Sequence, residues 1–269
     1  MPVFPDLAAG LRLALRARFL TLALWLGIAI VALTWMAAQF SGRQPATVAL
    51  DVGLSVIRLF LPLVIVMLVQ ELFSREFDRR HFLTSLTYPR PRHRFFLGRL
   101  AAASILVLVL LAAAGLLLAG LVWWIGQGYA QGTPVALGGH YLATLGFLAI
   151  DLFVVTAVAA FLAVVAVTPS FVLIGTFGFL IAARSYSGIV ALLSENPHVV
   201  GDGERYRSSL ELLGYLLPDL GALDIRMTAL YGSWTFLPAN WPVLLAGAVA
   251  YGLAFLALSV WALQRKRFS

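Results

Sequence analysis

The sequence predicts an all-α integral membrane protein, a polytopic bundle of six transmembrane helices. The chain has 269 residues, of which 61% are hydrophobic and only 12% are charged, and its mean hydropathy is +0.94. A soluble domain carries about 25% charged residues, so the composition excludes a water-soluble globule and a disordered chain. Backbone polar groups cannot stay unpaired in lipid, so each long apolar run must be a helix. The alternating pattern of an outer-membrane barrel is absent.

Six apolar runs are long enough to cross a hydrocarbon core of about 30 Å. They cover Leu20–Phe40, Val52–Leu72, Leu100–Ile125, Tyr141–Val167, Phe171–Leu193 and Trp241–Leu263. Most of the connections between them are short, and no composition shift divides the chain. We therefore expect residues 1–269 to form a single transmembrane domain.

The residues before the first span, 1–19, predict a short amphipathic helix. They lack the apolar core of a cleavable signal peptide. Leu7, Leu11 and Leu15 share one helical face, and arginines occupy much of the rest. We expect this helix to lie in the cytoplasmic interface of the membrane; a cytosolic extension of the first span is the alternative.

The distribution of cations predicts the orientation of the bundle. Of the 19 Lys and Arg residues, thirteen lie before the first span, between spans two and three, or after the last span; four lie on the opposite side and two within spans. Cytoplasmic loops are enriched in these residues. We therefore expect a multi-pass protein of the inner (plasma) membrane with both termini in the cytoplasm. Topology thus accounts for the net charge of +7, with membrane lipids rather than nucleic acid as its partner.

The long cytoplasmic segment, 74–99, predicts a short helix that protrudes from the bundle. Apolar residues recur at helical spacing among charges over Glu76–Thr87, and Pro89 and Pro91 end that helix. A second amphipathic helix starts at Arg92 and leads into span three. A partner protein that pushed on the protruding helix would move two spans together. A plain positively charged loop resting on the interface is the alternative.

The second long segment, 194–240, lies on the outer side. It begins polar and becomes amphipathic through Leu210–Leu217 and Leu220–Tyr231, with Pro218 between them. Two short helices that dip into the outer leaflet fit this pattern, and a solvated cap is the alternative.

Three charged residues lie inside spans: Arg58, Asp151 and Arg184. A charge that faces lipid unpaired costs several kcal/mol, so we expect all three to face the interior, water or one another. With alternating span directions, they lie toward the middle or outer half of the bilayer. We expect Asp151 to pair with one of the two arginines; a polar substrate path or a proton relay is the alternative.

Small residues in span six indicate close contact between helices. They recur at four-residue steps as Ala246, Ala250 and Ala254. Packing against the protein's own core is the simpler use, and a dimer interface is the other.

Neither catalysis nor metal binding is expected in this chain. The absence of Cys excludes disulfides and thiolate chemistry, and the four His residues do not recur at ligand spacing with a carboxylate. An intramembrane serine protease would need a Ser in a small-residue turn and a later His; Ser187-Gly188 is present, but no His follows His198 and none lies in the last span. The only Lys, Lys266, lies outside any Gly-Lys-Ser/Thr phosphate loop. Any ATP chemistry is therefore expected from another chain, and no cofactor is expected in this one.

One pattern runs through the cytoplasmic segment into span three. Its positions are Glu76, Arg80, Leu83, Leu86, Pro89, Arg92, Leu97, Gly98 and Arg99. It resembles the signature of permease subunits of type-2 ABC transporters. His81 stands where that family usually has Thr, which bears on how the loop helix is capped. Arg99 replaces the usual Lys, a milder change because both side chains reach lipid headgroups.

A second pattern lies in the outer segment, at Leu216–Asp219, Leu223–Arg226 and Tyr231-Gly232. It resembles a stretch before the last span in one branch of that family, often labelled as permeases involved in multi-copper-enzyme maturation. A copper path through this chain is not expected, because Cys is absent and the four Met residues are dispersed.

The resemblance implies the permease subunit of an exporter-type ABC transporter. Its cytoplasmic helix would be a coupling helix that docks on a separate ABC ATPase subunit, which binds ATP and Mg. The expected contacts with that subunit are Glu76, Asp78, Arg79, Arg80, Leu83, Leu86, Pro89 and Arg92. The family usually pairs two permease chains with two ATPases, so a homodimer or a heterodimer of permeases is expected.

Two other functions fit the same sequence. One is an ATP-independent secondary transporter that uses Asp151, Arg58 and Arg184 as its ion or substrate site. The other is a structural subunit of a membrane complex. The residues do not reveal the transported substrate.

Overall fold

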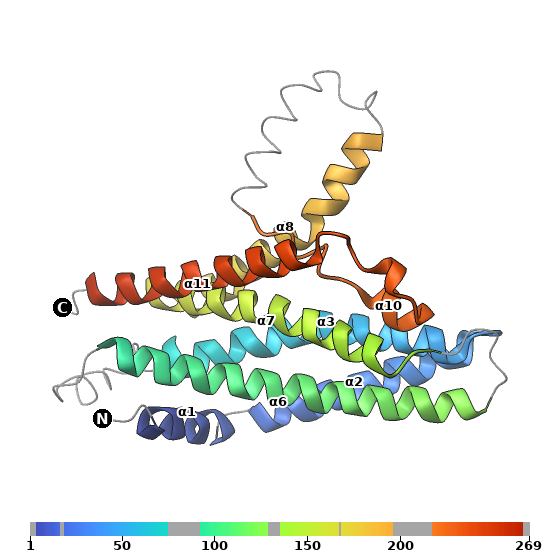
Figure 1. Ribbon diagram of the computed structural model, residues 1–269. Coiled ribbons are helices and arrows are strands. Elements are labelled where there is room, and N and C mark those ends of the chain that lie inside the picture. Colours follow the sequence, from blue (N-terminus) through green and yellow to red (C-terminus); the bar gives the residue numbers. More distant parts are fainter. Residues whose placement is uncertain are drawn as a thin grey trace.

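The structure, a computed structural model, describes residues 4–16, 19–74, 92–128, 135–166, 168–195 and 217–265. Within these ranges it is a bundle of long helices with no strand (Figure 1). Six of the described helices are long and apolar enough to cross a membrane. The predicted fold class, an all-α bundle of six spans, is confirmed.

The helices follow one another along the chain with short connections. They are α1 (Phe4–Arg16), α2 (Phe19–Phe40), α3 (Pro45–Val69), the π-helical turn η1 (Gln70–Ser74), α6 (Arg92–Gln127), α7 (Gly139–Val165), α8 (Pro169–Glu195), α10 (Arg226–Tyr231), the 3-10 turn η3 (Trp234–Phe236) and α11 (Trp241–Arg265). Each predicted span coincides with one long helix. The second begins at Pro45 rather than Val52, because proline is favoured in the first turn of a helix, where its missing N–H is not needed.

Different helices lie at the two ends of the bundle. The start of α1, the end of α11, the end of η1 and the start of α6 lie at one end (Figure 1). Helix α10 and η3 lie at the other, and the C-terminal part of α8 leans away from the bundle. The first and last described residues thus lie on the same side, as six spans require. The assignment of that side to the cytoplasm stays a prediction.

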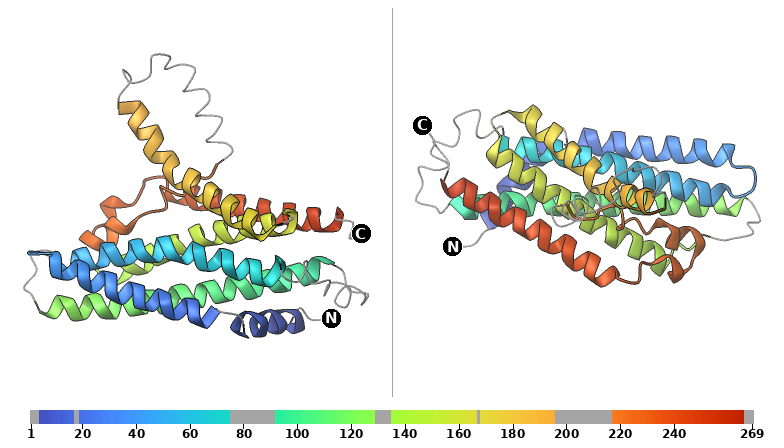
Figure 2. Two further views of the ribbon diagram at one scale, coloured as in Figure 1. Left: turned by 180° about the vertical axis from the view of Figure 1, so that it is seen from behind. Right: turned by 90° about the horizontal axis from the view of Figure 1, so that it is seen from above.

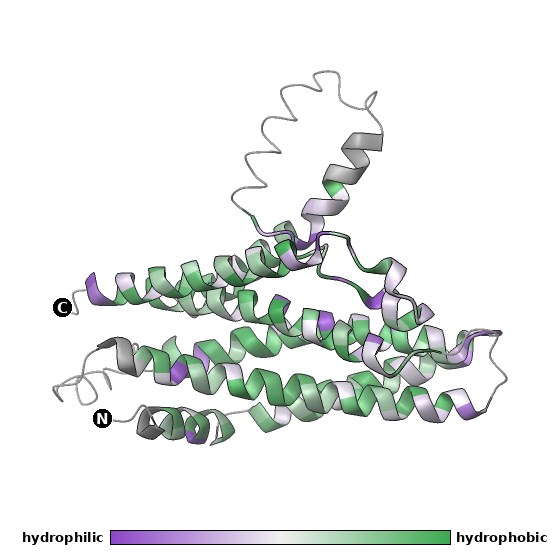
Figure 3. Cartoon of the chain, in the orientation of Figure 1, coloured by the Kyte–Doolittle hydropathy of each residue, from purple (hydrophilic) through white to green (hydrophobic). Residues whose placement is uncertain are grey.

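Helices α3 and α7 form the centre of the bundle. In their most apolar stretches 61% and 67% of the residues are buried, compared with 22% in α8 and 17% in α11. Figure 2 shows α8 and α11 beside this centre. The outer faces of the helices are apolar along their length, with polar residues mostly at the ends (Figure 3). An apolar exterior of this kind is what lipid contact requires.

Helix α1 packs against the start of α6. A Cβ atom added at Gly10 would lie 2.8 Å from the Cβ of Ala102, so the two helices approach closely there. Ala14, one turn further along α1, is fully buried. The amphipathic helix expected at the N-terminus is therefore present, and its position in the lipid–water interface stays a prediction.

The outer segment differs from the two helices expected in it. Residues 217–225 are irregular, and helix α10 begins only at Arg226. Instead of pairing within a helix, the backbone N–H of Leu220 donates to the carbonyl of Ala183 in α8 at 3.2 Å. The expected helix over Leu220–Tyr231 is wrong for its first half, where short turns within the segment and the contact with α8 satisfy the backbone. The first expected helix, Leu210–Leu217, lies outside the described residues apart from its last residue.

The small-residue stripe of α11 does not pack against the core. Ala246, Ala250 and Ala254 are exposed. The buried face of α11 instead carries Ala248 and Gly252, where the ring of Phe153 in α7 lies directly against the glycine. The simpler of the two expected uses of the stripe, core packing, is wrong.

Candidate functional site

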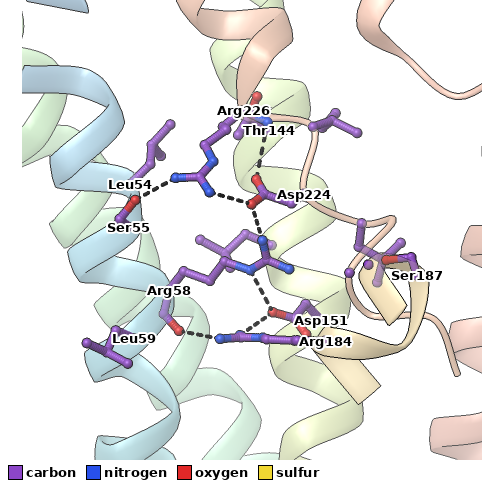
Figure 4. Close-up of a pocket in the computed structure, with 15 residues that line it drawn as sticks. Leu54, Ser55, Arg58, Leu59, Thr144, Asp151, Arg184, Ser187, Asp224 and Arg226 are labelled. Carbon is purple, nitrogen blue, oxygen red and sulfur yellow. Dashed lines mark hydrogen bonds and ion pairs between the residues drawn. The ribbon is translucent and has the colours of Figure 1, made fainter. Parts of the chain in front are cut away.

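Six charged side chains from four parts of the chain meet between α3, α7 and α8, and Figure 4 shows all of them except Asp51. We call them the charge cluster. Its members are Asp51 and Arg58 of α3, Asp151 of α7, Arg184 of α8, and Asp224 and Arg226 of the outer segment.

Helix geometry brings the three intramembrane charges to one depth. A helix rises about 1.5 Å per residue, so Arg58 lies roughly 20 Å from Pro45 and Asp151 roughly 18 Å from Gly139, both measured from the end that carries α10. Helix α8 runs in the opposite direction, and Arg184 lies roughly 22 Å from its start. All three charges therefore fall near the middle of their spans.

Asp151 connects both arginines. Its side chain is 1% exposed, and its Oδ2 atom lies 2.5 Å from Nη2 of Arg184 and 3.9 Å from Nε of Arg58. One of these contacts was expected from the sequence, and the structure brings all three residues together. Asp151 thereby ties α7 to α3 and to α8.

Arg184 has a second anchor on α3. Its Nη1 donates to the backbone carbonyl of Arg58 at 2.9 Å. That carbonyl is free because Pro62, four residues later, has no N–H with which to complete the helical hydrogen bond. The proline inside α3 thus creates the acceptor that Arg184 uses.

The outer segment enters the same cluster. Asp224 forms an ion pair with Nη1 of Arg58 and lies 3.1 Å from Nη2 of Arg226. Nη2 of Arg58 donates to the carbonyl of Leu220 at 2.8 Å. Arg226 in turn reaches α3, with Nη1 2.9 Å from Asp51 and 2.6 Å from Oγ of Ser55. The segment is therefore held on α3 by Asp224 and Arg226.

The cluster is electrically neutral as a whole. Three guanidinium groups face three carboxylates, which is how charges are accommodated at membrane depth. Two buried atoms, Oδ1 of Asp151 and Nε of Arg184, have no hydrogen-bond partner among the described residues. The cluster thus keeps one free acceptor and one free donor.

A pocket of about 580 Å³ adjoins the cluster. Its charged lining comes from Arg58, Asp151, Arg184, Asp224 and Arg226. Leucines of α3, α7 and the outer segment form much of the remaining wall, namely Leu54, Leu59, Leu148 and Leu223. The pocket therefore combines a charged interior with apolar walls.

Sequence reasoning missed the contribution of the outer segment to this site. Asp224 and Arg226 were noted only as parts of a resemblance pattern, and Asp51 was not among the expected site residues. A usable signal existed, since Asp224 and Arg226 are two opposite charges within an otherwise apolar stretch. No pattern in one sequence reveals that this stretch reaches Arg58.

Most of the expected ATPase contacts cannot be located. Glu76, Asp78, Arg79, Arg80, Leu83, Leu86 and Pro89 lie outside the described residues, and Arg92 is the first residue of α6. No group of three or more His, Cys, Asp or Glu residues in the described part of the chain could hold a metal ion.

The base of the cytoplasmic segment is described and is firmly packed. Phe73 of η1 and Phe96 of α6 flank the segment, are each 1% exposed, and have ring centroids 5.3 Å apart. Gln70, also in η1, donates from Nε2 to the carbonyl of Pro169 at 2.7 Å. The segment is thus joined at its base to α3, α6 and the start of α8.

Comparison with known protein families gives one match. The family described as ABC-2 family transporter protein matches residues 15–183, well over half of the chain. The matched stretch includes Arg58, Asp151 and the whole cytoplasmic segment. A search of curated proteins finds no match.

Proposed function

Because the chain belongs to the ABC-2 transporter family and is a multi-pass membrane permease domain, we propose that it couples ATP hydrolysis by a separate subunit to transport across the membrane. Membership implies partnership with an ATPase subunit. The family normally lacks ATPase activity of its own. The coupling helix, Glu76–Leu86, is the part of this chain that we assign to the partner.

The packed base of the cytoplasmic segment carries this proposal. A loop that transmits force must be fixed to the helices that it moves. The buried Phe73–Phe96 contact joins the two points at which the cytoplasmic segment leaves and re-enters the bundle. A push on the segment therefore moves α3 and α6 as one unit. The bond from Gln70 to Pro169 extends this connection to α8.

The same helices lead to the charge cluster. Helix α3 carries Arg58 at mid-depth and continues at its inner end into η1, which carries Phe73, and α8 carries Pro169 and Arg184 in the same way. Movement of either helix at its inner end changes the distances among Arg58, Asp151 and Arg184. The proposed cycle therefore links the ATPase contact to the pocket through two helices.

Further features of the assembly complete the proposal. We assign the transporter to the inner (plasma) membrane, with both termini cytoplasmic and with export as its direction. A second permease chain, identical or related, pairs with this one. The pattern at Leu216–Gly232 supports membership in the branch labelled for multi-copper-enzyme maturation.

Removal of two charged side chains from the coupling helix tests the proposal. Glu76→Ala combined with Arg80→Ala should lower transport per ATP hydrolysed in the reconstituted complex, while the permease stays folded. Glu204→Ala combined with Arg205→Ala is the matched control, because it removes the same two charges from the opposite side. Normal coupling in the first variant would reject the assigned position of the ATPase contact. So would ATP hydrolysis or transport by the isolated chain.

The charge cluster favours one second candidate, a carrier that works without ATP. Asp151 is buried at mid-depth beside a pocket, as the carboxylate of a proton-driven carrier would be. Proton-gradient-dependent transport by the purified chain, with no ATPase present, would support this candidate over the first.

A further inference from the structure

We propose that the pocket beside the charge cluster binds the anionic head group of an amphiphile, and that Asp224 occupies the position of that anion in this structure. The inference rests on the transport function proposed above, since it names the class of molecule that the permease takes. In this structure Asp224 pairs with Arg58. With a ligand bound, the anionic head group would take the place of Asp224.

Arg58 is positioned to bind an anion that enters the pocket. Its guanidinium group pairs with Asp224, donates to the carbonyl of Leu220 at 2.8 Å and lies 3.9 Å from Asp151. Two of these three partners belong to the outer segment and not to a membrane helix. The planar fork of an arginine matches carboxylate and phosphate groups equally well. A ligand with either group therefore finds at Arg58 the geometry that Asp224 now uses.

The charge balance selects an anion over a cation. When the outer segment leaves, Asp224 and Arg226 leave with it. Arg58 and Arg184 then face only Asp151, so one positive charge is in excess at mid-depth. Asp51 does not cancel it, because that side chain is 47% exposed and lies about 10 Å along the helix from Arg58. An unpaired charge in this position is costly, and an incoming anion removes the cost.

The walls and the mouth of the pocket select an amphiphile. Leu54 and Leu148 line the interior, and the rim is exposed at Leu59 of α3, which is 60% exposed, and at Gly188 of α8. The mouth therefore lies between α3 and α8, within the length of two membrane spans. A head group at Arg58 would leave its apolar chain at this mouth, next to lipid. A volume of about 580 Å³ has room for the head group and the first part of the chain.

The outer segment is suited to leave the pocket. Residues 217–225 form no regular secondary structure. One backbone hydrogen bond, from Leu220 to Ala183, and the close approach of Gly221 to the carbonyl of Arg184 hold the segment on α8. The remaining attachments are the ion pairs of Asp224 and Arg226, the bond from Arg58 to the carbonyl of Leu220, and the buried side chains of Leu220, Leu223 and Ile225. A competing anion at Arg58 would thus break the contact that fixes the segment most deeply.

A binding measurement with dodecyl phosphate tests the inference. The purified full-length chain is placed in nanodiscs of zwitterionic phosphatidylcholine, and affinity is measured by calorimetry for the wild type, D224N and D224N/R58Q. Asn keeps the shape and a hydrogen-bond acceptor of Asp but removes the competing charge. We expect D224N to bind about tenfold more tightly than the wild type, and the double variant to lose this gain. D219N is the matched control, because Asp219 belongs to the same segment and accepts from the backbone N–H of Ala222 at 3.0 Å.

Several outcomes would overturn the inference. An unchanged affinity in D224N, an equal gain in D219N, or a gain retained in D224N/R58Q would each reject Asp224 as the occupant of the anion position. An equal gain for inorganic phosphate would reject the amphiphile and leave a plain anion site. Thermal unfolding checks each variant, and D224S replaces D224N if the latter does not fold. No ATP or ATPase is present, so a negative result here leaves the test at Glu76 and Arg80 independent.

Discussion

Replacement of Asp151 by alanine should destabilise the bundle more than any other loss of a carboxylate in the described part of the chain. Asp151 is 1% exposed and pairs with Arg184, whose side chain is 16% exposed, and with Arg58, which is 17% exposed. Removal of one partner from a buried ion pair costs about 3–5 kcal/mol, because the other charge stays buried and unpaired. Arg184 keeps its bond to the carbonyl of Arg58, so we expect about 3 kcal/mol, near the lower end.

The assay is thermal unfolding of the purified chain in nanodiscs, followed by tryptophan fluorescence. The chain has seven tryptophans. A loss of about 3 kcal/mol corresponds to a decrease in Tm of about 6–12 °C for a protein of this size. Asp51→Ala is the matched control, since it also removes a carboxylate from an arginine, at 2.9 Å, but from a side chain that is 47% exposed. An exposed pair contributes at most about 1 kcal/mol.

A double-mutant cycle separates the ion pair from other effects of the substitution. Arg184→Ala alone should be destabilising, but in the Asp151→Ala background it should cost little, because the unpaired charge is then gone. We expect a coupling energy of about 2 kcal/mol. Additive effects of the two substitutions would refute the reasoning. Equal losses in Asp151→Ala and Asp51→Ala would do the same, since burial would then have no influence.

Two further predictions concern the contacts of α8. Gly221→Ala should lower stability by about 1–3 kcal/mol, because the new Cβ would lie 2.6 Å from the carbonyl of Arg184, which cannot move freely. Gly120→Ala is the control and should not lower the Tm, because a Cβ there would meet nothing within 4 Å. Equal Tm values for the two variants would contradict this prediction. Gln70→Leu should reduce transport per ATP in the reconstituted complex. Its cost in stability should be only about 1 kcal/mol, because the bond to Pro169 lies at an exposed position. An unchanged ratio of transport to ATP hydrolysis would exclude this bond from the coupling path.

The sequence predicted the six helices well because a bilayer leaves few alternatives. Any apolar run of sufficient length must satisfy its own backbone, and hydropathy alone locates such runs. The ends of the predicted spans differ from the structure by a few residues in most cases. The difference at Pro45 arises because the first turns of α3 are less apolar and include Asp51. Hydropathy locates the apolar core of a span better than its ends.

The charge cluster was predictable only in part. The cost of a charge in lipid was sufficient to predict that Arg58, Asp151 and Arg184 turn away from lipid and that Asp151 pairs with one of the two arginines. It did not indicate that both arginines share Asp151. The entry of the outer segment was not predictable, because Leu220 satisfies its backbone through Ala183 and Arg58, which are distant in sequence. Periodicity describes a segment by itself and does not include such partners.

The packed face of α11 shows the same limit. Two sets of small residues recur at four-residue steps on different faces of this helix. One set includes Ala246 and Ala250, and the other includes Ala248 and Gly252. Spacing cannot distinguish them. The ring of Phe153 on α7 determines which face of α11 packs against α7, because the ring fits only where the facing residue has no side chain, as at Gly252.

The coupling that we propose between the cytoplasmic segment and the charge cluster should depend on Pro62. This residue lies in α3 between Arg58 and the end that continues into η1, and it removes the hydrogen bond that would otherwise close on the Arg58 carbonyl. This turn is therefore the weakest in α3, and a push at the inner end bends the helix there more readily than elsewhere. Arg184 occupies the freed carbonyl, so α8 follows any bend of α3 at this depth. Because Asp151 and Asp224 both depend on the positions of these two arginines, a bend at Pro62 would loosen the outer segment and expose Arg58 in the same movement.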